Sequence, residues 1–306
     1  MSLKKSVAIG TVVLVGFGVG VIYYLHARGS QPAPEVVSAE PKEFHAAAPA
    51  EKPETNAPKK NSAPETKAEE KKVAPSTPPI LPPVDTGQPL KAGEVLEYTA
   101  NVSKLNNVAT LSVKVVGRGN FAGKNAWHLQ ATAHTQNPLR MVFELDDQFD
   151  SYSDAGTLAS MQYEMRLSER GQKVESLQRM TASDKEPAPA DASAARVLPG
   201  TRDPLGMMEY LRNVDWSKTP EVRCPVYDGH KLYDARAKLT GGPDIVEVPS
   251  GKYSASKIGI RVFENGVEMK DASFVLYVAN DAAHTPVLLE AVLPFATARV
   301  ELLKTK

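Results

Sequence analysis

The sequence predicts a mostly β domain, an antiparallel barrel-like or sandwich structure of about a dozen strands with one short helix. A transmembrane helix and a disordered linker are expected to precede it. Three observations support this fold class. Apolar residues alternate with polar ones from about residue 90 to the end, turn signals recur roughly every 8–12 residues, and the crossover helices of a parallel sheet are missing.

The first element is an apolar run over residues 6–25 that contains no charged residue. At about 1.5 Å per helical residue, a run of this length can cross a hydrocarbon core roughly 30 Å thick. A signal peptide usually has a shorter apolar region and a small-x-small cleavage site, whereas this run ends at Leu25, His26 and Ala27. The sequence favours a retained single-pass anchor over residues 1–26 and leaves a cleaved signal peptide as the alternative.

The residues around and within this run predict its orientation and one contact. Lys4 and Lys5 precede it, which favours a cytoplasmic N-terminus. In a bacterium, the anchor would then lie in the inner membrane and the C-terminal domain in the periplasm. Gly16 and Gly20 lie four residues apart, a spacing that lets two membrane helices approach closely. A homodimer through these glycines is one expectation, and an anchor that does not dimerise is the other.

Residues 27–89 are rich in Pro, Ala, Glu and Lys and nearly free of aromatic residues. Such a segment cannot offset its ordering entropy by burying apolar surface, so a disordered linker is expected. A flexible coil of this length spans about 45 Å on average. The linker would serve either as a tether that gives the domain reach across the envelope or as a stalk that clears the bilayer.

Residues 90–306 are expected to form the β-domain. Apolar alternation predicts its first strands, with a turn at Asn106-Asn107 between the first two. A more polar partner strand is expected over 172–180. The alternating sets lie over 96–102, 109–115, 127–133, 141–145 and 161–167.

One helix interrupts the strands. Asp203 can cap its N-terminus, Pro204 fits its first position, and apolar residues follow at helical spacing as far as Val214. We expect Trp216 to pack this helix onto the sheet. Residues 183–195, just before it, are low in complexity and are expected to form a loop.

Two hairpin signals follow the helix, Asp228-Gly229 and Asn265-Gly266. Both dipeptides suit a two-residue type I′ turn. Gly241-Gly242-Pro243 is expected to form a further turn. The strands around these turns are expected over 222–227, 230–239, 258–262, 274–278, 287–293 and 298–302.

The densest polar stretch runs over residues 144–154. Alternation places Glu144, Asp146 and Gln148 on one face of a strand and Asp147 on the other. The stretch lacks the glycine and the distal glutamate of a calcium loop. A solvated strand edge and turn is therefore favoured over a site for acid–base chemistry.

The histidines and the cysteine also favour structural roles. His128 and His134 would share a strand face but lie about 20 Å apart along it, too far for one metal ion. His284 is expected in a turn, and Cys224, the only cysteine, lies in an apolar alternation that predicts a buried side chain. No nucleophile elbow, zinc-protease motif or phosphate loop occurs. We expect no catalytic, cofactor or metal site and a protein that is not an enzyme.

Several segments in this order resemble a known family. They are Ala92-Gly93-Glu94-Val95-Leu96-Glu97-Tyr98, residues 147–154, Arg202-Asp203-Pro204-Leu205 with Tyr210-Leu211-Arg212, residues 228–233, Ser250-Gly251-Lys252-Tyr253 and the tail over 281–303. The family consists of exported, periplasmic bacterial proteins with a β-rich domain of unknown function, and the resemblance covers about residues 90–306. It implies a closed or nearly closed antiparallel β structure outside the cytoplasm and assigns no catalytic residues. The long anchor and linker depart from the signal peptides typical of this family.

Two functions are expected. The leading one is a membrane-tethered periplasmic binding domain for an apolar or amphiphilic envelope component such as lipid, because a barrel of this strand number can enclose a cavity. The alternative is a non-enzymatic scaffold or protein-interaction module that docks an envelope-protein partner on its surface or sheet edge. A hydrolase is a third alternative, which would need residues to converge in the fold. Equal counts of 36 basic and 36 acidic residues argue against a nucleic-acid partner.

Overall fold

The computed structural model describes residues 90–181, 194–294 and 296–306. Within these ranges the chain forms a 13-stranded sheet, one α-helix and one short 3-10 helix. The mostly β class with one short helix is therefore confirmed. The elements are β1 Val95–Val102, β2 Leu105–Phe121, β3 Lys124–Thr135, η1 Leu139–Met141, β4 Asp146–Asp154, β5 Ser160–Glu169, β6 Gln172–Thr181, β7 Ala194–Arg196, α2 Pro204–Asn213, β8 Glu221–Tyr227, β9 Leu232–Val248, β10 Gly251–Glu264, β11 Val267–Ala279, β12 Pro286–Leu293 and β13 Ala296–Thr305.

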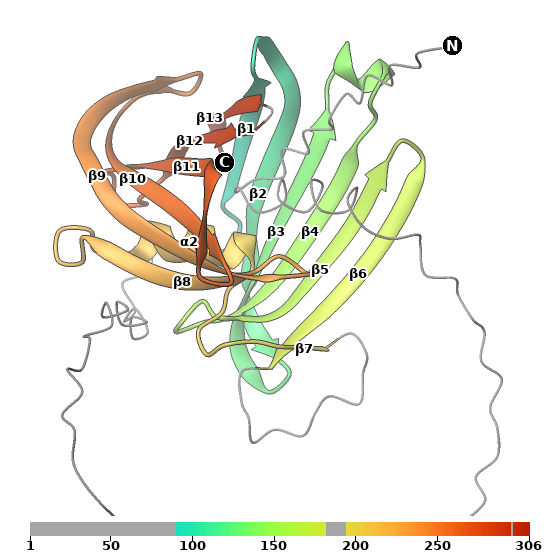
Figure 1. Ribbon diagram of the computed structural model, residues 1–306, viewed down its shortest axis with the longest axis vertical. Helices are drawn as coiled ribbons and strands as arrows, with labels where there is room; N and C mark the ends of the chain where they lie inside the picture. Colours follow the sequence, from blue (N-terminus) through green and yellow to red (C-terminus); the bar gives the residue numbers. More distant parts are fainter. Residues whose placement is uncertain (1–89, 182–193, 295) are drawn as a thin grey trace, which may run out of the picture. The chain divides into compact units, whose positions relative to one another are not determined.

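The strands form one curled sheet in the order β7-β6-β5-β4-β3-β2-β1-β13-β12-β11-β10-β9-β8. Strands β1–β6 and β8–β13 face each other across a common interior (Figure 1). The sequence left barrel and sandwich open, and a single curled sheet selects the barrel-like form. The sheet is not closed, because its end strands β7 and β8 are not neighbours in the hydrogen-bonded order.

A short segment before the helix links the two ends of the sheet. Arg202 forms a parallel bridge with Val226 of β8. On the other side, the Ser160 N–H at the start of β5 donates to the Thr201 carbonyl at 3.0 Å. The gap is therefore bridged at this point by backbone hydrogen bonds rather than by a continuous strand.

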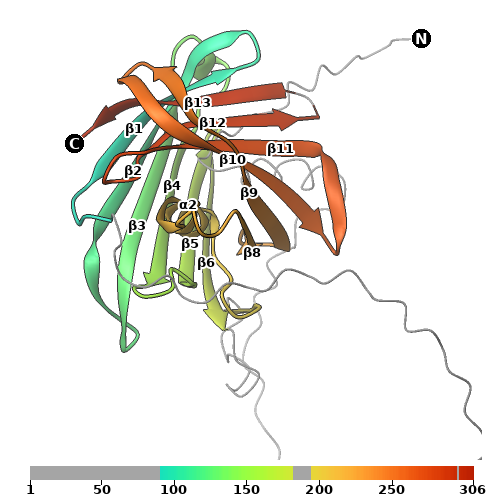
Figure 2. The same ribbon diagram turned by 90° about the vertical axis from the view of Figure 1, so that its left-hand side faces the viewer.

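Helix α2 lies within the curl of the sheet (Figure 2). All ten of its residues are buried, including the charged Glu209 and Arg212. The sequence predicted a helix with one apolar stripe, packed onto the sheet by Trp216. Trp216 is buried and its Nε1–H donates to the Leu211 carbonyl at 3.1 Å, but the helix fills the interior instead of covering one face. The Asp203 cap and the position of Pro204 are confirmed.

The predicted strand over 141–145 is wrong. Met141 ends the 3-10 helix η1, its side chain is 82% exposed, and β4 begins only at Asp146. Pro138 favours this turn because its fixed φ suits a helical start and it has no N–H for a strand ladder. Arg140 then holds the turn by donating to Glu144 at 2.8 Å and to Asp146 at 2.7 Å.

Three predicted turns differ in detail. The first hairpin turns at Ser103-Lys104, between β1 and β2, and not at Asn106-Asn107. The Asp228-Gly229 turn extends to Lys231, because the Asp228 carboxylate accepts the N–H groups of His230 and Lys231 at 2.8 and 2.7 Å. The two-residue Asn265-Gly266 turn is confirmed, with φ values of 50° and 81°.

Gly241-Gly242-Pro243 does not form a turn but lies inside β9. At this point the β9–β10 register shifts. Gly242 has a φ of +108°, and an added Cβ would come within 2.8 Å of the Ala255 carbonyl oxygen. The glycine therefore lets β9 bulge and continue where the sequence indicated a break.

The anchor over 1–26, the linker over 27–89 and most of the loop over 183–195 lie outside the described residues. Ala194 and Ala195, the last residues of that loop, belong to β7. In the ranges that are described, no helix is long and apolar enough to cross a membrane.

Candidate functional site

A cavity of about 30 Å³ lies between α2 and strands of the β8–β12 half. Its walls are almost wholly apolar, so water has no polar partner there. The volume accommodates about one water-sized group. Among the described residues, this cavity beside α2 is too small for an acyl chain. The lining includes Met207, Leu211, Val226, Tyr233, Ile260 and Leu276.

The N-terminus of α2 is fixed by the fully buried carboxylate of Asp203. Its Oδ1 accepts the N–H groups of Leu205 and Gly206, each at 2.9 Å. Its Oδ2 accepts the hydroxyls of Ser151 and Ser160, each at 2.5 Å. Burial raises the pKa of Asp203, and the four hydrogen bonds offset this only in part. Asp203 thus caps the helix and ties it to β4 and β5 at once.

Arg202 adds a second contact at this end of the helix. Its guanidinium lies 3.7 Å from the centroid of the Tyr210 ring, a cation–π distance. Its two terminal nitrogens donate to the Gly200 carbonyl at 2.8 Å and to the Thr157 carbonyl at 2.6 Å. Two carbonyl dipoles and an aromatic face therefore stabilise the charge, while the buried Nε of Arg202 has no hydrogen-bond partner in the part of the chain that the structure describes.

The C-terminal end of α2 is held by Arg212, whose side chain is fully buried. The guanidinium donates to both carboxylate oxygens of Glu94 at 2.7 Å and to the Ala283 carbonyl at 2.7 Å. Glu209, one turn earlier, is a further acceptor at 3.2 Å, and burial raises its pKa. The bidentate pair joins the helix to the residue just before β1, and removal of one partner would leave a buried charge unpaired.

The segments that carry the family resemblance meet at this helix. Glu94, Ser151, Asp203 and Arg212 come from three such segments that are far apart in the sequence. They form two polar clusters, one at each end of α2. The cluster around Asp203 is closed to solvent, whereas Glu94 of the other cluster is 14% exposed and lines an open groove. Both clusters position the helix, so we assign them to holding the plugged barrel and not to a reaction.

A third polar cluster lies on the outer face of β3, β4 and β5 and is centred on Asp150. One carboxylate oxygen accepts His128 Nε2 at 2.7 Å and Gln130 Nε2 at 2.9 Å. The other accepts Gln148 Nε2 at 2.6 Å and an Arg166 nitrogen at 2.7 Å. Burial alone would raise the pKa of Asp150, but the hydrogen bonds from Gln148, His128 and Gln130 together lower it. Every acceptor position is filled, which leaves none for a ligand.

Asp146 and Gln148 share one face of β4 and Asp147 lies on the other, as predicted, whereas Glu144 precedes the strand. The predicted strand edge is wrong, because β4 lies between β3 and β5. Asp146 faces outward, and Arg140, followed by His134, lowers its pKa to about 2. Asp147 faces the interior and is 1% exposed. Burial raises its pKa to about 7. Its Oδ1 accepts the Ser168 N–H at 2.9 Å, and its Oδ2 has no partner within the described ranges.

The histidines do not come together. His128 contacts Asp150, whereas His134 contacts Asp146 at 2.8 Å. His284 lies in the predicted turn, with its Nδ1 3.0 Å from the Arg212 carbonyl. Cys224 is buried as predicted, and burial raises the pKa of its thiol. In the part of the chain that the structure describes, no group of three or more His, Cys, Asp and Glu could hold a metal ion.

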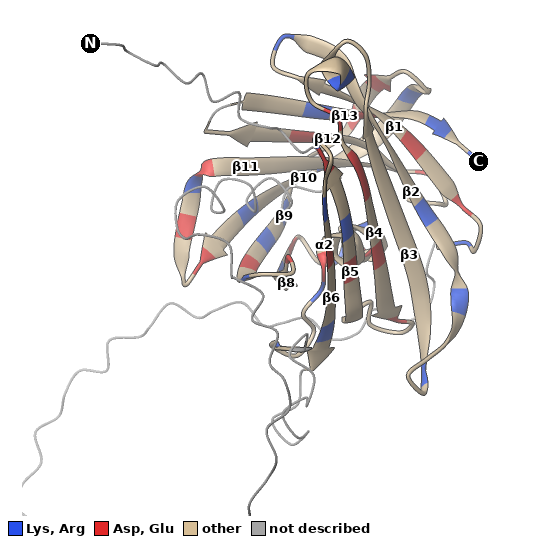
Figure 3. Ribbon diagram, turned by 90° about the vertical axis from the view of Figure 1, so that its right-hand side faces the viewer, with Lys and Arg blue, Asp and Glu red and all other residues tan. Residues whose placement is uncertain are grey.

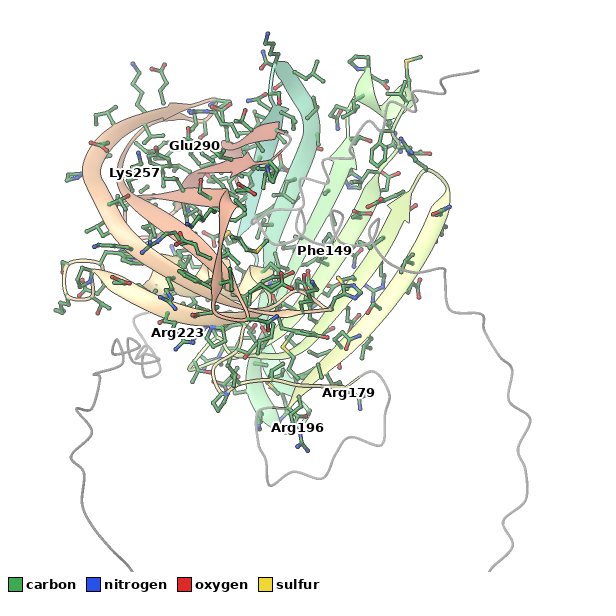
Figure 4. The ribbon with its side chains drawn as sticks, in the orientation of Figure 1. Phe149, Arg179, Arg196, Arg223, Lys257 and Glu290 are labelled. Atoms are coloured by element: carbon green, nitrogen blue, oxygen red, sulfur yellow. The ribbon has the colours of Figure 1, made fainter. Side chains whose placement is uncertain are left out.

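The accessible feature of the sheet is the free edge of β6, which we define as residues 172–178. On one side β6 pairs with β5 in an uninterrupted register, whereas most other strand pairs contain a shift. On the other side it pairs only through residues 179–181 with β7, near the labelled Arg179 and Arg196 (Figure 4). Among the described residues, no strand covers the free edge.

The free edge of β6 is exposed and mixed in character. Lys173 and Glu175 are exposed, Val174 is 50% exposed and Leu177 is 38% exposed. Strands β5 and β6 carry charges of both signs, whereas the charged residues of β4 are all aspartates (Figure 3). A regular strand without a bulge or a proline presents its N–H and C=O groups as a template for another strand. The sequence predicted a polar partner strand here, but nothing in it indicated that most of this strand would have a neighbour on one side only.

Comparisons with known proteins bear on the family. Residues 97–303 match the profile of the family described as "Protein of unknown function (DUF3108)". A comparison with curated proteins found no match.

Two solved structures are similar to this chain. One is a β-barrel-like protein of the domain of unknown function DUF1849 from Brucella abortus, with 11% identity, a TM-score of 0.42, and coverage of 70% of this chain and 97% of that chain. The other, provisionally described as a lipoprotein, comes from Parabacteroides distasonis, with 13% identity, a TM-score of 0.33, and coverage of 71% and 96%. These similarities are too weak to bear on function.

Proposed function

The chain belongs to the DUF3108 family, and we propose that this member is a membrane-tethered, extracytoplasmic interaction module without catalytic activity. It docks an extended strand of a protein partner on the free edge of β6. The anchor and linker expected over residues 1–89 hold the module near the membrane and raise its local concentration there.

The observation that carries this proposal is the occupied interior. Helix α2 lies inside the curl of the sheet, where a barrel of this type would hold a ligand, and the cavity beside it among the described residues measures about 30 Å³. A partner must therefore be recognised on the outside. This favours the scaffold hypothesis over a lipid carried inside the barrel.

The free edge of β6 supports this mode of recognition. When an extended peptide adds to a sheet edge, main-chain hydrogen bonds provide affinity and alternate side chains provide specificity. The edge offers seven consecutive residues, 172–178, with an apolar side chain at Val174 between two charged residues and another at Leu177 between two polar ones. An edge of this length matches a common strand length of roughly five to six residues.

Hydrogen exchange of the full-length chain tests the proposal. We expect those amides of residues 172–178 that are not bonded to β5 to exchange at least tenfold more slowly in native membranes than in the chain diluted in detergent. Glu175→Pro should abolish this protection, because proline removes an N–H on the free side of the strand and blocks pairing there. Glu175→Ala is the matched control and should retain it.

Equal exchange rates in membranes and in dilute detergent would contradict the proposal. The lipid-binding hypothesis would be supported if lipid co-purified with the chain at a fixed molar ratio and slowed amide exchange in α2 instead of β6. A displaced α2 would be needed to make room for such a ligand.

A further inference from the structure

We propose that the strand docked on β6 is β6 of a second copy of this chain, in an antiparallel register centred on Val174. This inference rests on the proposed function and names the partner of the same edge. It follows from three properties of the edge: which backbone groups are free, where the charges lie, and where β7 ends the available length.

The β5–β6 hairpin determines which backbone groups are free. Arg170 and Gly171 form a two-residue turn, with φ values of 51° and 77°, and Glu169 pairs with Gln172 across it. In such a hairpin the flanking pair is hydrogen-bonded, and every second pair after it is as well. Gln172, Val174, Ser176 and Gln178 therefore direct their backbone groups to β5. Lys173, Glu175 and Leu177 direct theirs to the free side.

The β7 side of the sheet agrees with this alternation. The carbonyl of Thr181, also an odd-numbered residue, accepts the Val197 N–H at 3.0 Å. The β6–β7 pairing occupies residues 179–181 and so limits an incoming strand to the free edge.

Three two-fold registers, centred on residues 174, 175 and 176, place the free backbone groups opposite one another and overlap by at least five residues of the free edge. A register centred on Glu175 places this carboxylate directly opposite the same carboxylate of the second copy. A register centred on Ser176 sets Lys173 against Arg179 of the partner subunit, where β7 already pairs. Like charges directly opposite one another destabilise a strand pair, so both registers are disfavoured.

The register centred on Val174 is complementary. It sets Lys173 opposite Glu175 of the partner subunit, and the symmetry repeats this pair. Both residues lie on the outer face, because Glu175 pairs with Arg166 of β5, whose side chain contacts Asp150 on that face. Within the described residues, neither Lys173 nor Glu175 forms an ion pair. The two exposed Val174 side chains then meet at the axis on the inner face. The pairs between Lys173 and the partner's Glu175 are also the hydrogen-bonded ones.

The resulting interface is isologous and closed. Each copy uses its β6 edge once, so the pairing stops at two chains instead of propagating into a filament. Only about five residues overlap in each strand, so we expect a weak dimer that depends on the local concentration provided by the membrane.

Disulfide trapping tests the register in the full-length chain. Cys224 is the only cysteine and is buried, and Cys224→Ala leaves a background without thiols. In that background we expect Val174→Cys to form a disulfide-linked dimer under mild oxidation in native membranes, because a non-hydrogen-bonded antiparallel pair has Cα atoms about 4.5 Å apart. Ser176→Cys is the matched control. Its copies would lie about 13 Å apart along the strands and should remain monomeric.

Charge reversal provides a second test that does not depend on cross-linking. Lys173→Glu and Glu175→Lys should each weaken the dimer about tenfold by opposing like charges. A mixture of the two variants should restore it, since each copy then supplies the charge that the other lacks. Neither position is buried, so both variants should fold normally.

The outcomes separate the two proposals. A Val174→Cys dimer and rescue by mixing support the self-pairing. Slow amide exchange in residues 172–178 without the Val174→Cys cross-link would overturn the self-pairing. It would still support the docking of a strand from a different protein. Cross-linking of Ser176→Cys as efficient as that of Val174→Cys would overturn the register. Absence of both protection and cross-link would overturn both proposals.

Discussion

Asp203 and Asp150 are two carboxylates that each accept four hydrogen bonds, yet their pKa values shift in opposite directions. The two carboxylates lie on opposite sides of β4. Asp150 belongs to β4 and points outward, whereas the next residue, Ser151, points inward and donates to Asp203. The donors to Asp203 are two backbone amides and two hydroxyls, all neutral, in the dry interior. Those to Asp150 include Arg166 and His128 beside solvent.

The comparison shows that the number of hydrogen bonds does not by itself determine the pKa of a buried carboxyl. Burial disfavours the charged form of both groups, but it is less complete at Asp150, where the hydrogen bonds from Gln148, His128 and Gln130 outweigh it. The interior cluster therefore fixes α2 in one position at an electrostatic cost. The outer cluster is a stable arrangement on a surface that solvent partly screens.

The largest expected effect is at Asp203. Asp203→Ala would leave two helix N–H groups and two buried hydroxyls without an acceptor and should lower the free energy of unfolding by about 5 kcal/mol. Urea denaturation at pH 7 measures this. Asp203→Asn should cost clearly less, because the amide oxygen can still cap the helix. Equal losses for the two variants would show that the charge, and not the hydrogen bonding, is what α2 requires.

Asp147 shows the effect of burial on a carboxyl group that has few hydrogen bonds. It is buried, and within the described residues it accepts only one backbone N–H. Its pKa is raised to about 7, so the protonated form is favoured in the folded state. Its contribution to stability is present below about pH 4 and is lost as the pH rises through about 7. We expect Asp147→Asn to be as stable as the parent chain at pH 4 and more stable at pH 8, by up to about 4 kcal/mol.

The measurement for Asp147 is thermal or urea unfolding of both chains between pH 4 and pH 8. The difference in free energy of unfolding should grow steadily with pH. A difference that is constant with pH would contradict the assigned pKa direction and would point to a water or ion bound at Oδ2.

The smallest effect is expected at Asp150. Asp150→Asn should lower the free energy of unfolding by about 1–2 kcal/mol at pH 7, because Arg166 is half exposed and water can replace the lost partner. The pKa of Asp150 is lowered in the folded state, so its contribution is present above about pH 4 and is lost as the pH falls further. The parent chain and the variant should therefore converge below about pH 3. If Asp150→Asn lowered the free energy of unfolding as much as Asp203→Ala, the expected difference between the outer and the interior carboxylate would be contradicted.

Much of the strand pattern could be predicted from local residues. Alternation identified the inward residues of β1–β3, such as Leu96, Leu111 and Leu129, since a half-buried strand repeats every two residues. Capping by Asp203 identified the start of α2. Prediction failed at residues 139–145, where Pro138 and the local contacts of Arg140 override the apolar alternation. It also failed at Gly242, where the bulge depends on the pairing of β9 with β10.

The candidate sites could be predicted only in part. The opposed faces of Asp146 and Asp147 follow from period two alone. The four donors around Asp150 come from three strands, and the register between those strands determines that they meet. Glu94 and Arg212 are 118 positions apart, and no local pattern relates them.

The sequence by itself determined the elements: strands from alternation, the helix from its cap, and the expectation of an anchor from an uncharged apolar run. Those features depend on neighbours along the chain. Only the tertiary structure decided that the helix fills the barrel, that β4 is an inner strand and that β6 is an edge. Each of these depends on the order of strands in the sheet, which arises from contacts between residues far apart and leaves no periodic signal in the sequence.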